Sequence, residues 1–245
     1  MDQSDVTGFG KTGDFFQSSP YRVLHIQHEF GIYGGAKNFS IFKLIEKIKK
    51  PFLVTLHSTR PNPEDWEKEI ISHLHQRNSF TIVQSNTAKR IMIQEYNGVP
   101  EKVVYIPHGV PVPPLHKRTF FRKKWKWENK IIALSFGLLK TEKGLENMIE
   151  ATSIIKRKYP DFYYYILGKP HPRHRTYQGR FFLDYLKELA KKTGADNNVI
   201  IPGEYLDEET LLSLIIASDM VITPYARSAE KQTISGVLSY AFGCG

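Results

Sequence analysis

The chain of 245 residues is long enough for one or two domains, and its 41% hydrophobic and 13% aromatic content is typical of a globular protein. No apolar run approaches the roughly 20 residues of a membrane span, and the polar, Gly-rich first residues contain no signal-peptide core. The net charge of +9 favours an anionic partner, for which nucleotides, nucleic acids and anionic membranes all qualify. The single cysteine, Cys244, excludes an internal disulfide and suits a reducing compartment, so we expect a cytoplasmic protein.

Short apolar runs alternate along the chain with amphipathic helical patterns. Strands are expected over residues 21–27, 51–57, 80–84, 103–106, 131–136, 162–167, 199–201 and 220–223. Helices are expected over residues 37–49, 63–77, 86–97, 144–157, 181–193 and 208–217. Apolar strands that alternate with helices indicate parallel sheets covered on both faces. The pattern therefore predicts an α/β fold with two doubly wound, Rossmann-like parallel sheets.

The alternation is interrupted once, where Pro111, Pro113 and Pro114 precede a stretch, residues 117–127, that mixes basic and aromatic residues and has no acid. Clustered prolines disfavour a helix and a central strand, so a linker is expected over residues 116–129. It would separate a first domain, residues 1–115, from a second, residues 130–245. Ligands of doubly wound sheets bind beyond the carboxyl ends of the strands, which places the expected site in a cleft between the two sheets.

Two loops of the second domain have the features of an anion site. After the strand at 131–136, Gly137 is followed by Lys143 and Gly144, which open a helix. A lysine beside free backbone N–H groups can hold a diphosphate, although a surface lysine in an ordinary loop is the alternative. Near the end of the chain, an apolar strand over 221–225 is followed by a polar loop with Glu230 and then by an expected helix over 232–242. The N–H groups and dipole of that helix start would attract an anion.

In the first domain, histidines and glycines follow the strands. His28 ends the first strand, Gly34 and Gly35 precede the next helix, His57 ends the second strand, and His108 follows the fourth. A neutral imidazole at such a place can hydrogen-bond a sugar hydroxyl, and a purely structural histidine is the alternative. Because His25 and His28 point to opposite faces of a strand, no shared metal is expected.

The ordered set of motifs resembles a known family. Pro107-His108-Gly109, Gly137…Lys143-Gly144 and Glu230…Ser235-Gly236 are spaced as in the retaining glycosyltransferases of family 4, within the glycosyl transferases group 1, which have the two-domain GT-B fold. One subgroup is also similar in the segments 27–35, 55–57, 171–172 and 232–236. The resemblance implies transfer of a hexose from a nucleotide-diphosphate sugar to a glycan or a lipid-linked acceptor, with retention of configuration.

The resemblance also implies roles for residues. His57 and Glu230 would be catalytic, with Glu230 holding hydroxyls of the donor sugar. The donor-binding residues would be Gly137, Lys143, Gly144, Lys231, Gln232, Thr233, Ser235 and Gly236. The residues on the acceptor side or lining the cleft would be His28, Gly34, Gly35, His108 and His171. No metal and no other cofactor is expected, because Lys143 and the helix start would neutralise the leaving diphosphate. The same-face reaction implied by the family assigns no protein nucleophile.

The chain departs from the family pattern at two positions and at both ends. Leu138 and Leu238 stand where the family often has an arginine and a glutamate. About four strands precede the expected linker, and the chain stops at Gly245 before a closing strand, so both sheets are expected to be incomplete. A truncated chain of this kind is expected to be weakly active or inactive alone.

Other interpretations remain open. A related GT-B enzyme, such as a disaccharide phosphorylase or a nucleotide-sugar epimerase, would carry similar motifs. The basic stretch at 117–127 fits a peripheral contact with the inner face of a membrane, or a solvated linker. A non-catalytic binding module or an inactive fragment is the third possibility. Nucleic acid is not an expected partner, because the sequence has no recognition helix, RNP-like strand or zinc spacing.

Overall fold

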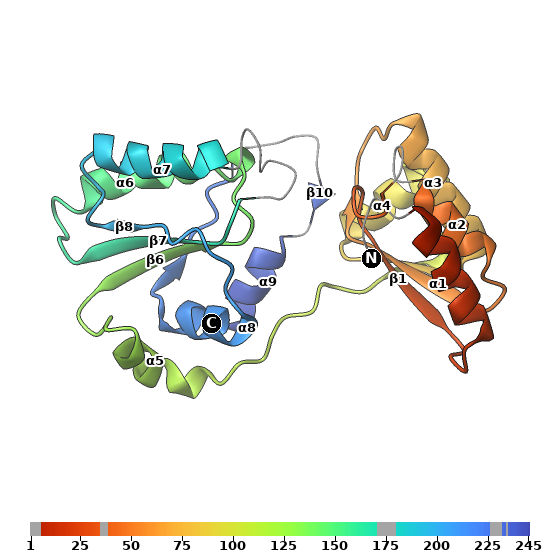
Figure 1. Ribbon diagram of the computed structural model, residues 1–245, viewed down its shortest axis with the longest axis horizontal. Coiled ribbons are helices and arrows are strands. Elements are labelled where there is room, and N and C mark those ends of the chain that lie inside the picture. Colours follow the sequence, from red (N-terminus) through yellow and green to blue (C-terminus); the bar gives the residue numbers. More distant parts are fainter. Residues whose placement is uncertain (1–5, 35–38, 171–179, 226–231, 234) are drawn as a thin grey trace. The chain divides into compact units, whose positions relative to one another are not determined.

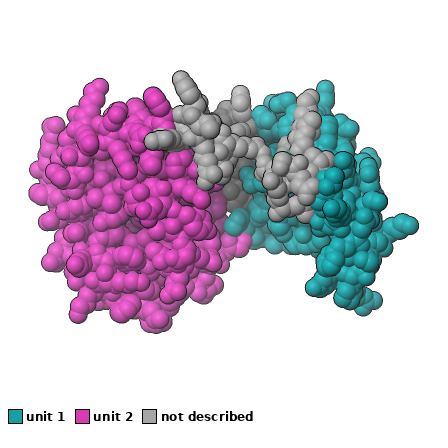
Figure 2. Space-filling model, in the orientation of Figure 1, with its two compact units in different colours: residues 1–108, 228–234 teal, residues 109–227, 235–245 magenta. Residues whose placement is uncertain are grey.

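The computed structural model describes residues 6–34, 39–170, 180–225, 232–233 and 235–245. The chain divides into two compact units, which Figure 2 colours separately. Unit 1 contains residues 1–108 and 228–234, and unit 2 contains residues 109–227 and 235–245. Each unit has a four-stranded parallel sheet with helices between the strands (Figure 1), which confirms the predicted α/β fold.

The sheet of unit 1 has the order β1-β2-β4-β5. Its strands are β1 (Leu24–His28), β2 (Phe52–Leu56), β4 (Phe80–Val83) and β5 (Val103–Tyr105). The connecting helices are α2 (Ser40–Glu46), α3 (Asp65–Arg77) and α4 (Asn86–Glu95), and a 3-10 turn (Pro100–Lys102) leads into β5. The Ser85 side chain caps α4 as expected, because its Oγ accepts a hydrogen bond from the Ala88 N–H at 2.9 Å.

The core of unit 1 lies on one face of its sheet. Ile26, Val54, Leu56 and Val83 point to this face and pack with the helices in a single buried cluster. The strand residues that alternate with them point to the other face, where His25 and Gln27 are exposed. The sequence pattern predicts helices on both faces of each sheet. In the described part of unit 1, helices pack on one face only.

Helix α1 (Val6–Ser18) precedes the sheet and was not predicted, because its sequence is polar and Gly-rich. Phe9 and Phe16 lie seven positions apart on one face of this helix and are buried in the unit 1 core. Lys50 Nζ donates hydrogen bonds to the carbonyl oxygens of Phe16 at 3.2 Å and Ser19 at 2.7 Å, which ties the end of α1 to the chain before β2.

A second, two-stranded sheet in unit 1 joins distant segments. Strand β3 (Ser58–Thr59) pairs antiparallel with β10 (Gln232–Thr233), and Thr233 lies opposite Ser58. The expected helix over residues 232–242 is therefore wrong at its start. The helix in this region, α9, begins at Gly236 and ends at Gly243.

The sheet of unit 2 has the order β8-β7-β6-β9. Its strands are β6 (Ile131–Phe136), β7 (Phe162–Leu167), β8 (Val199–Ile200) and β9 (Met220–Val221). Helices α6 (Leu145–Ile155) and α7 (Arg180–Lys192) cover one face, and α5 (Arg118–Lys124), α8 (Glu208–Ala217) and α9 cover the other (Figure 1). Two buried clusters result, one on each face of the sheet.

The stretch expected to be a linker, residues 116–129, is instead part of unit 2. A 3-10 turn (Leu115–Lys117) leads directly into α5, and Trp127 is buried with 2% of its surface exposed. The three prolines precede this helix rather than interrupt it, so they do not prevent it from forming.

Candidate functional site: a lysine pocket at the strand ends of unit 2

The loops that follow β6, β7 and β9 meet at distances that only glycine permits. Gly168 follows β7 with φ +136°, and a Cβ placed there would lie 2.1 Å from the carbonyl oxygen of Gly137. Gly144 has φ +62°, and its Cβ would lie 2.2 Å from the carbonyl oxygen of Pro224. Gly137 has φ +99°. Glycine is required at these positions both by the left-handed backbone and by the lack of space for a side chain.

Lys143 lies within this group of loops, on a 3-10 turn (Thr141–Lys143) just before α6. Its Nζ donates a hydrogen bond to the carbonyl oxygen of Phe136 at 2.6 Å. Burial, and to a smaller extent the charge of Lys140, lowers the pKa of Lys143 to about 8. Among the described residues no carboxylate lies within 4.0 Å of this ammonium group. The protein thus holds a half-buried positive charge that the described part of the chain does not neutralise.

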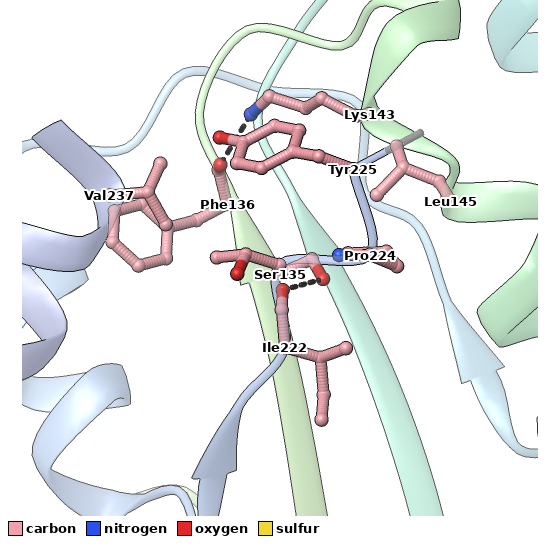
Figure 3. Close-up of a pocket in the computed structure, with 9 residues that line it drawn as sticks. Ser135, Phe136, Lys143, Leu145, Ile222, Pro224, Tyr225 and Val237 are labelled. Carbon is pink, nitrogen blue, oxygen red and sulfur yellow. Dashed lines mark hydrogen bonds between the residues drawn. The ribbon is translucent and has the colours of Figure 1, made fainter. Parts of the chain in front are cut away.

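Lys143 borders a small pocket that is partly open to solvent (Figure 3). The pocket is lined by residues of the strand ends and of the helix starts, namely Ser135, Phe136, Lys143, Leu145, Ile222, Thr223, Pro224, Tyr225 and Val237. Ser135 has a structural role here, because its Oγ donates to the Ile222 carbonyl at 2.6 Å and accepts from Tyr164 Oη at 2.8 Å. Lys143 and Tyr225 are left as the side chains best suited to bind a polar ligand.

The first turn of α9 forms another border of the pocket through Val237. Ser235 is the N-cap residue, but its side chain makes no capping hydrogen bond, so it does not satisfy the first N–H groups of α9. Its Oγ lies 3.4 Å from Tyr225 Oη. Gly236 is exposed, and a Cβ placed on it would have no atom of the described residues within 4 Å. The start of α9 therefore offers N–H donors and open space beside Lys143.

The structure brings together several of the predicted donor-binding residues, namely Gly137, Lys143, Gly144, Ser235 and Gly236. Gln232 and Thr233 lie on β10, opposite the residues that follow His57. Glu230, Lys231, Gly35 and His171 lie outside the described residues. Leu138 and Leu238 are each 39% exposed and do not line the pocket.

In unit 1, His57 directly follows β2 at the carboxyl end of the sheet. Its backbone N–H donates to the His28 carbonyl at 2.9 Å, and its Nε2 lies 2.7 Å from Gln27 Oε1, an oxygen that only accepts, so Nε2 carries the proton. Burial lowers the pKa of His57, and the neighbouring His108 and His25 lower it further, whereas Glu29 acts in the opposite direction. His57 is consequently a neutral imidazole at pH 7.

Polar contacts continue from His57 across the exposed face of the sheet. Gln27 Nε2 lies 3.1 Å from His25 Nε2, which in turn lies 2.7 Å from Thr55 Oγ1. These contacts hold the Gln27 amide in place, and through it the ring of His57. In the sequence, Gln27 stands out only as part of a motif, and no local pattern signals its hydrogen bonds to two histidines.

His28 has different surroundings, although it is close to His57 in space. It is fully buried, stacks on Tyr33 at 5.5 Å between ring centroids and contacts the edge of Phe30 at 5.1 Å. Neither ring nitrogen has a hydrogen-bond partner. Burial, with a contribution from His57, lowers the pKa of His28 to about 4. His28 therefore packs as a neutral aromatic residue. Gly34, the residue after Tyr33 in the sequence, has a left-handed backbone with φ +53°.

No group of three His, Cys, Asp or Glu residues in the described part of the chain is arranged to hold a metal ion. Within the same residues, no helix is long and apolar enough to cross a membrane.

Comparison with known proteins shows which family the second half of the chain resembles. Residues 117–235 match the family model described as Glycosyl transferases group 1, and this range contains Gly137, Lys143 and Gly144. Over just under half of its length, the chain is thus similar to the Glycosyl transferases group 1 domain. No curated protein sequence matches the chain.

The fold of the chain, with a parallel sheet in each unit, matches solved structures of the GT-B fold. Anabaena Alr3699/HepE in complex with UDP has a TM-score of 0.66 at 17% identity, over 98% of this chain and 60% of that one. The same protein in complex with UDP-glucose has a TM-score of 0.59 at 17% identity, over 88% and 55%. A UDP-forming alpha,alpha-trehalose-phosphate synthase from Burkholderia xenovorans has a TM-score of 0.68 at 12% identity, over 100% and 62%. The chain thus spans 55% to 62% of the length of these structures.

Proposed function

We propose that the unit 2 pocket binds the diphosphate of a nucleotide sugar, and that the chain functions in a family 4 glycosyltransferase. The enzyme would transfer a hexose to a glycan or a lipid-linked acceptor with retention of configuration. The observation that carries the proposal is Lys143, a half-buried ammonium group with no carboxylate near it among the described residues. A buried charge without a counter-charge is costly, and an anionic ligand would lower that cost.

The surroundings of Lys143 favour phosphate among possible anions. The start of α9 supplies backbone N–H groups beside the lysine, and helix starts bind phosphate through such groups. At Gly236 no described atom lies within 4 Å of the Cβ position, which leaves room for an approaching ligand. The complexes of HepE with UDP and UDP-glucose lend support, since they have the same fold.

The same groups would assist the reaction. As the donor bond breaks, negative charge grows on the leaving diphosphate, and fixed N–H dipoles and an ammonium group stabilise it without a metal ion. We assign His57 to the donor sugar as a neutral hydrogen-bonding group, which agrees with its lowered pKa. Glu230 would hold hydroxyls of that sugar. No protein nucleophile is assigned, because the leaving phosphate would assist attack on the same face. The single cysteine and a nucleotide-sugar donor both suit the cytoplasm.

A thermal-shift titration of the purified chain with UDP, GDP, ADP and their glucose conjugates tests donor binding. A ligand that binds only the folded state raises the melting temperature. We expect a shift with one of the nucleotides, its loss in Lys143→Ala, and its retention in Lys187→Ala, which removes an exposed lysine from α7. A cooperative melt without a shift for any nucleotide would contradict the proposal. An equal shift in the Lys143→Ala protein would show that Lys143 does not contribute to nucleotide binding.

The pKa of Lys143 gives a second test. A free pKa of about 8 means that the lysine loses its charge as the pH rises through 8, so the affinity for the nucleotide should fall between pH 7 and pH 9. Phosphate groups with a second pKa of about 6 are already ionised over this range. Lys143→Arg keeps its charge and should bind with little pH dependence. Isothermal titration calorimetry at both pH values measures the effect, and an equal fall for the arginine variant would contradict it.

Transfer itself is tested by the release of nucleotide from the donor that binds, with simple glycans and glycolipids as acceptors. The anomeric configuration of the product, determined by NMR, distinguishes retention from inversion. An inverted product would overturn the retaining mechanism but leave the donor site intact.

A further inference from the structure

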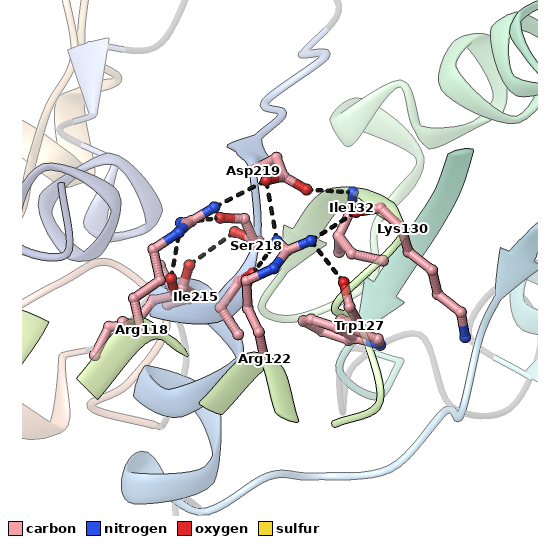
Figure 4. Close-up of polar contacts among 10 residues, drawn as sticks. Arg118, Arg122, Trp127, Lys130, Ile132, Ile215, Ser218 and Asp219 are labelled. Atoms are coloured by element: carbon pink, nitrogen blue, oxygen red, sulfur yellow. Dashed lines mark hydrogen bonds and ion pairs between the residues drawn. The ribbon is translucent and has the colours of Figure 1, made fainter. Parts of the chain in front are cut away.

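The orientation of α5 in unit 2 is fixed by two arginines on its inner face (Figure 4). Arg118 Nη1 donates to the carbonyl oxygens of Ile216 at 2.9 Å and Ser218 at 2.5 Å, at the end of α8. Arg122 donates to the carbonyl oxygens of Ala217, Trp127 and Lys130 at 2.6 to 2.8 Å. Both arginines also pair with Asp219 Oδ1, at 2.8 and 3.0 Å. Both guanidinium groups therefore have their partners within unit 2.

Because Arg118 and Arg122 point inward, the residues on the opposite side of the helix point outward. Phe120 lies near the middle of this outer face and is 63% exposed. Lys117, Lys123 and Lys124 surround it on the same side, and all three are exposed. None of these lysines has a carboxylate within 4.0 Å among the described residues. The outer face of α5 thus combines an exposed aromatic ring with three positive charges that no described carboxylate neutralises. One of them, Lys124, lies over the ring of Trp125, 5.0 Å from its centroid.

Two exposed apolar residues precede α5 in the chain. Val112 is 95% exposed and Leu115 is 47% exposed. Residues 109–127 contain no acid, so no negative charge from the segment itself opposes an anionic partner. We define the α5 surface as Val112, Leu115, Lys117, Phe120, Lys123 and Lys124. The α5 surface thus places exposed apolar side chains in the same short segment as lysines.

We propose that the α5 surface docks on an anionic lipid bilayer. Lysines beside apolar side chains are the combination that binds the interface of such a membrane, where the cations meet the headgroups and the apolar groups enter the acyl boundary. Charge alone would also suit nucleic acid, but exposed Val112, Leu115 and Phe120 contribute no contact to a phosphate backbone. The inference is independent of the nucleotide pocket, whose residues lie on other loops of unit 2.

The test is sedimentation of the full chain with vesicles of phosphatidylcholine alone or of phosphatidylcholine mixed equally with phosphatidylglycerol. We expect binding to the anionic vesicles only, with an affinity that falls as salt is added. Each lysine near the surface contributes a factor of roughly five, so replacing all three (K117Q, K123Q and K124Q) should weaken binding on the order of 100-fold. The matched control replaces three exposed lysines of α7 (K187Q, K191Q and K192Q), with the same loss of charge.

The apolar part of the surface is tested separately. Phe120→Ala should weaken vesicle binding about five-fold, whereas Phe242→Ala, which removes a 78% exposed ring from α9, should not. All replaced side chains are exposed, so the melting temperatures should stay close to that of the parent protein. If the triple variant does not fold, the single Phe120→Ala variant still tests the proposal.

Three results would overturn the proposal. The first is no binding to anionic vesicles, and the second is an equal loss for the α5 and α7 triple variants, which would indicate general charge attraction. The third is binding to a single-stranded polynucleotide that depends on the α5 lysines but not on Phe120, together with weaker binding to vesicles. That result would assign the surface to nucleic acid instead.

Discussion

The two units use the carboxyl ends of their parallel strands in different ways. In unit 2 the strand ends are joined by glycines, and the loops that bear Gly137, Gly144 and Gly168 touch one another through their backbones. In unit 1 the strand ends carry histidines, one exposed in a polar network and one buried among aromatic rings. Unit 2 thus shapes its site with the backbone, and unit 1 shapes its site with side chains.

The difference follows from the number of core clusters. The unit 2 sheet is held between two clusters, which fix the loops around the pocket beside Lys143. The described part of unit 1 has one cluster, so polar side chains can lie on the open face of the sheet and bind one another. We infer that the stability of unit 2 is reduced most by replacing a loop glycine. The stability of unit 1 should instead depend on whether a histidine is protonated.

The largest expected effect is that of Gly168→Ala in unit 2. Its methyl group would lie 2.1 Å from the Gly137 carbonyl oxygen, at a φ of +136°, so the loops must separate. We expect the free energy of unfolding of unit 2 to fall by more than about 4 kcal/mol. Gly194→Ala is the matched control, because its φ is +69° but a Cβ there meets no atom within 4 Å, and it should cost about 1 kcal/mol. Hydrogen exchange resolved by peptide measures each unit separately, and equal losses for the two variants would contradict the backbone argument.

The next effect is that of Arg122→Ala, which tests how α5 is held on unit 2. The change leaves three carbonyl oxygens without this donor and removes one partner of Asp219, so we expect a loss of about 3 kcal/mol. Lys123→Ala, one residue along the same helix and exposed, should change the stability by less than about 0.5 kcal/mol. Hydrogen exchange of α5 and α8 peptides is the measurement. Protection that stays the same in Arg122→Ala would show that packing alone holds α5.

A smaller effect is expected in unit 1 as the pH falls. His28 binds a proton in the folded state only near pH 4, whereas an unfolded histidine binds one near pH 6.5. The unfolded state therefore takes up more protons between these values, and the stability that is present above pH 6.5 is lost as the pH falls towards 4. The expected loss between pH 7 and pH 5 is about 2 kcal/mol.

His28→Phe keeps an aromatic ring in the cluster but cannot be protonated, so it should abolish this part of the pH dependence. His75 is the matched control: it is also buried, but both of its nitrogens are bonded, to Thr81 Oγ1 at 2.7 Å and to the Val99 N–H at 2.9 Å. His75→Phe should destabilise unit 1 at pH 7, because it leaves these partners unpaired. Denaturant titrations at pH 7 and pH 5 measure both variants. A pH dependence that is unchanged in His28→Phe would assign the effect to other groups.

The sequence predicts best where burial alone decides the structure. The strands at 131–136 and 162–167 were predicted with their observed bounds, because a continuous apolar run fits a strand that is buried on both faces. Helix α8 also matches its prediction at 208–217, since Asp207 caps it and an apolar run continues to its end. The loop glycines and Lys143 were found from their positions between a strand and a helix, and the structure brings them together.

Prediction failed where contacts between distant residues decide the structure. Helix α5 depends on hydrogen bonds from Arg118 and Arg122 to residues about 100 positions away, which no local pattern reveals. Helix α1 depends on a core that its own sequence cannot form. The first residues of the helix expected at 232–242 are taken by β10, which pairs with a strand of unit 1. Only the structure shows that α9 starts at Gly236, and this start can be tested.

Gly236→Ala is expected to have the smallest effect on stability and a clear effect on ligand binding. A Cβ on Gly236 meets no atom within 4 Å in the described part of the chain, and the residue is exposed, so the free energy of unfolding should change by less than about 0.5 kcal/mol. The same methyl group would occupy the space in which a phosphate approaches the first N–H groups of α9. If that approach is the reason for glycine here, the affinity for the nucleotide that binds should fall about ten-fold, as measured by calorimetry. An unchanged affinity would place the phosphates elsewhere in the pocket and leave Lys143 as their main contact.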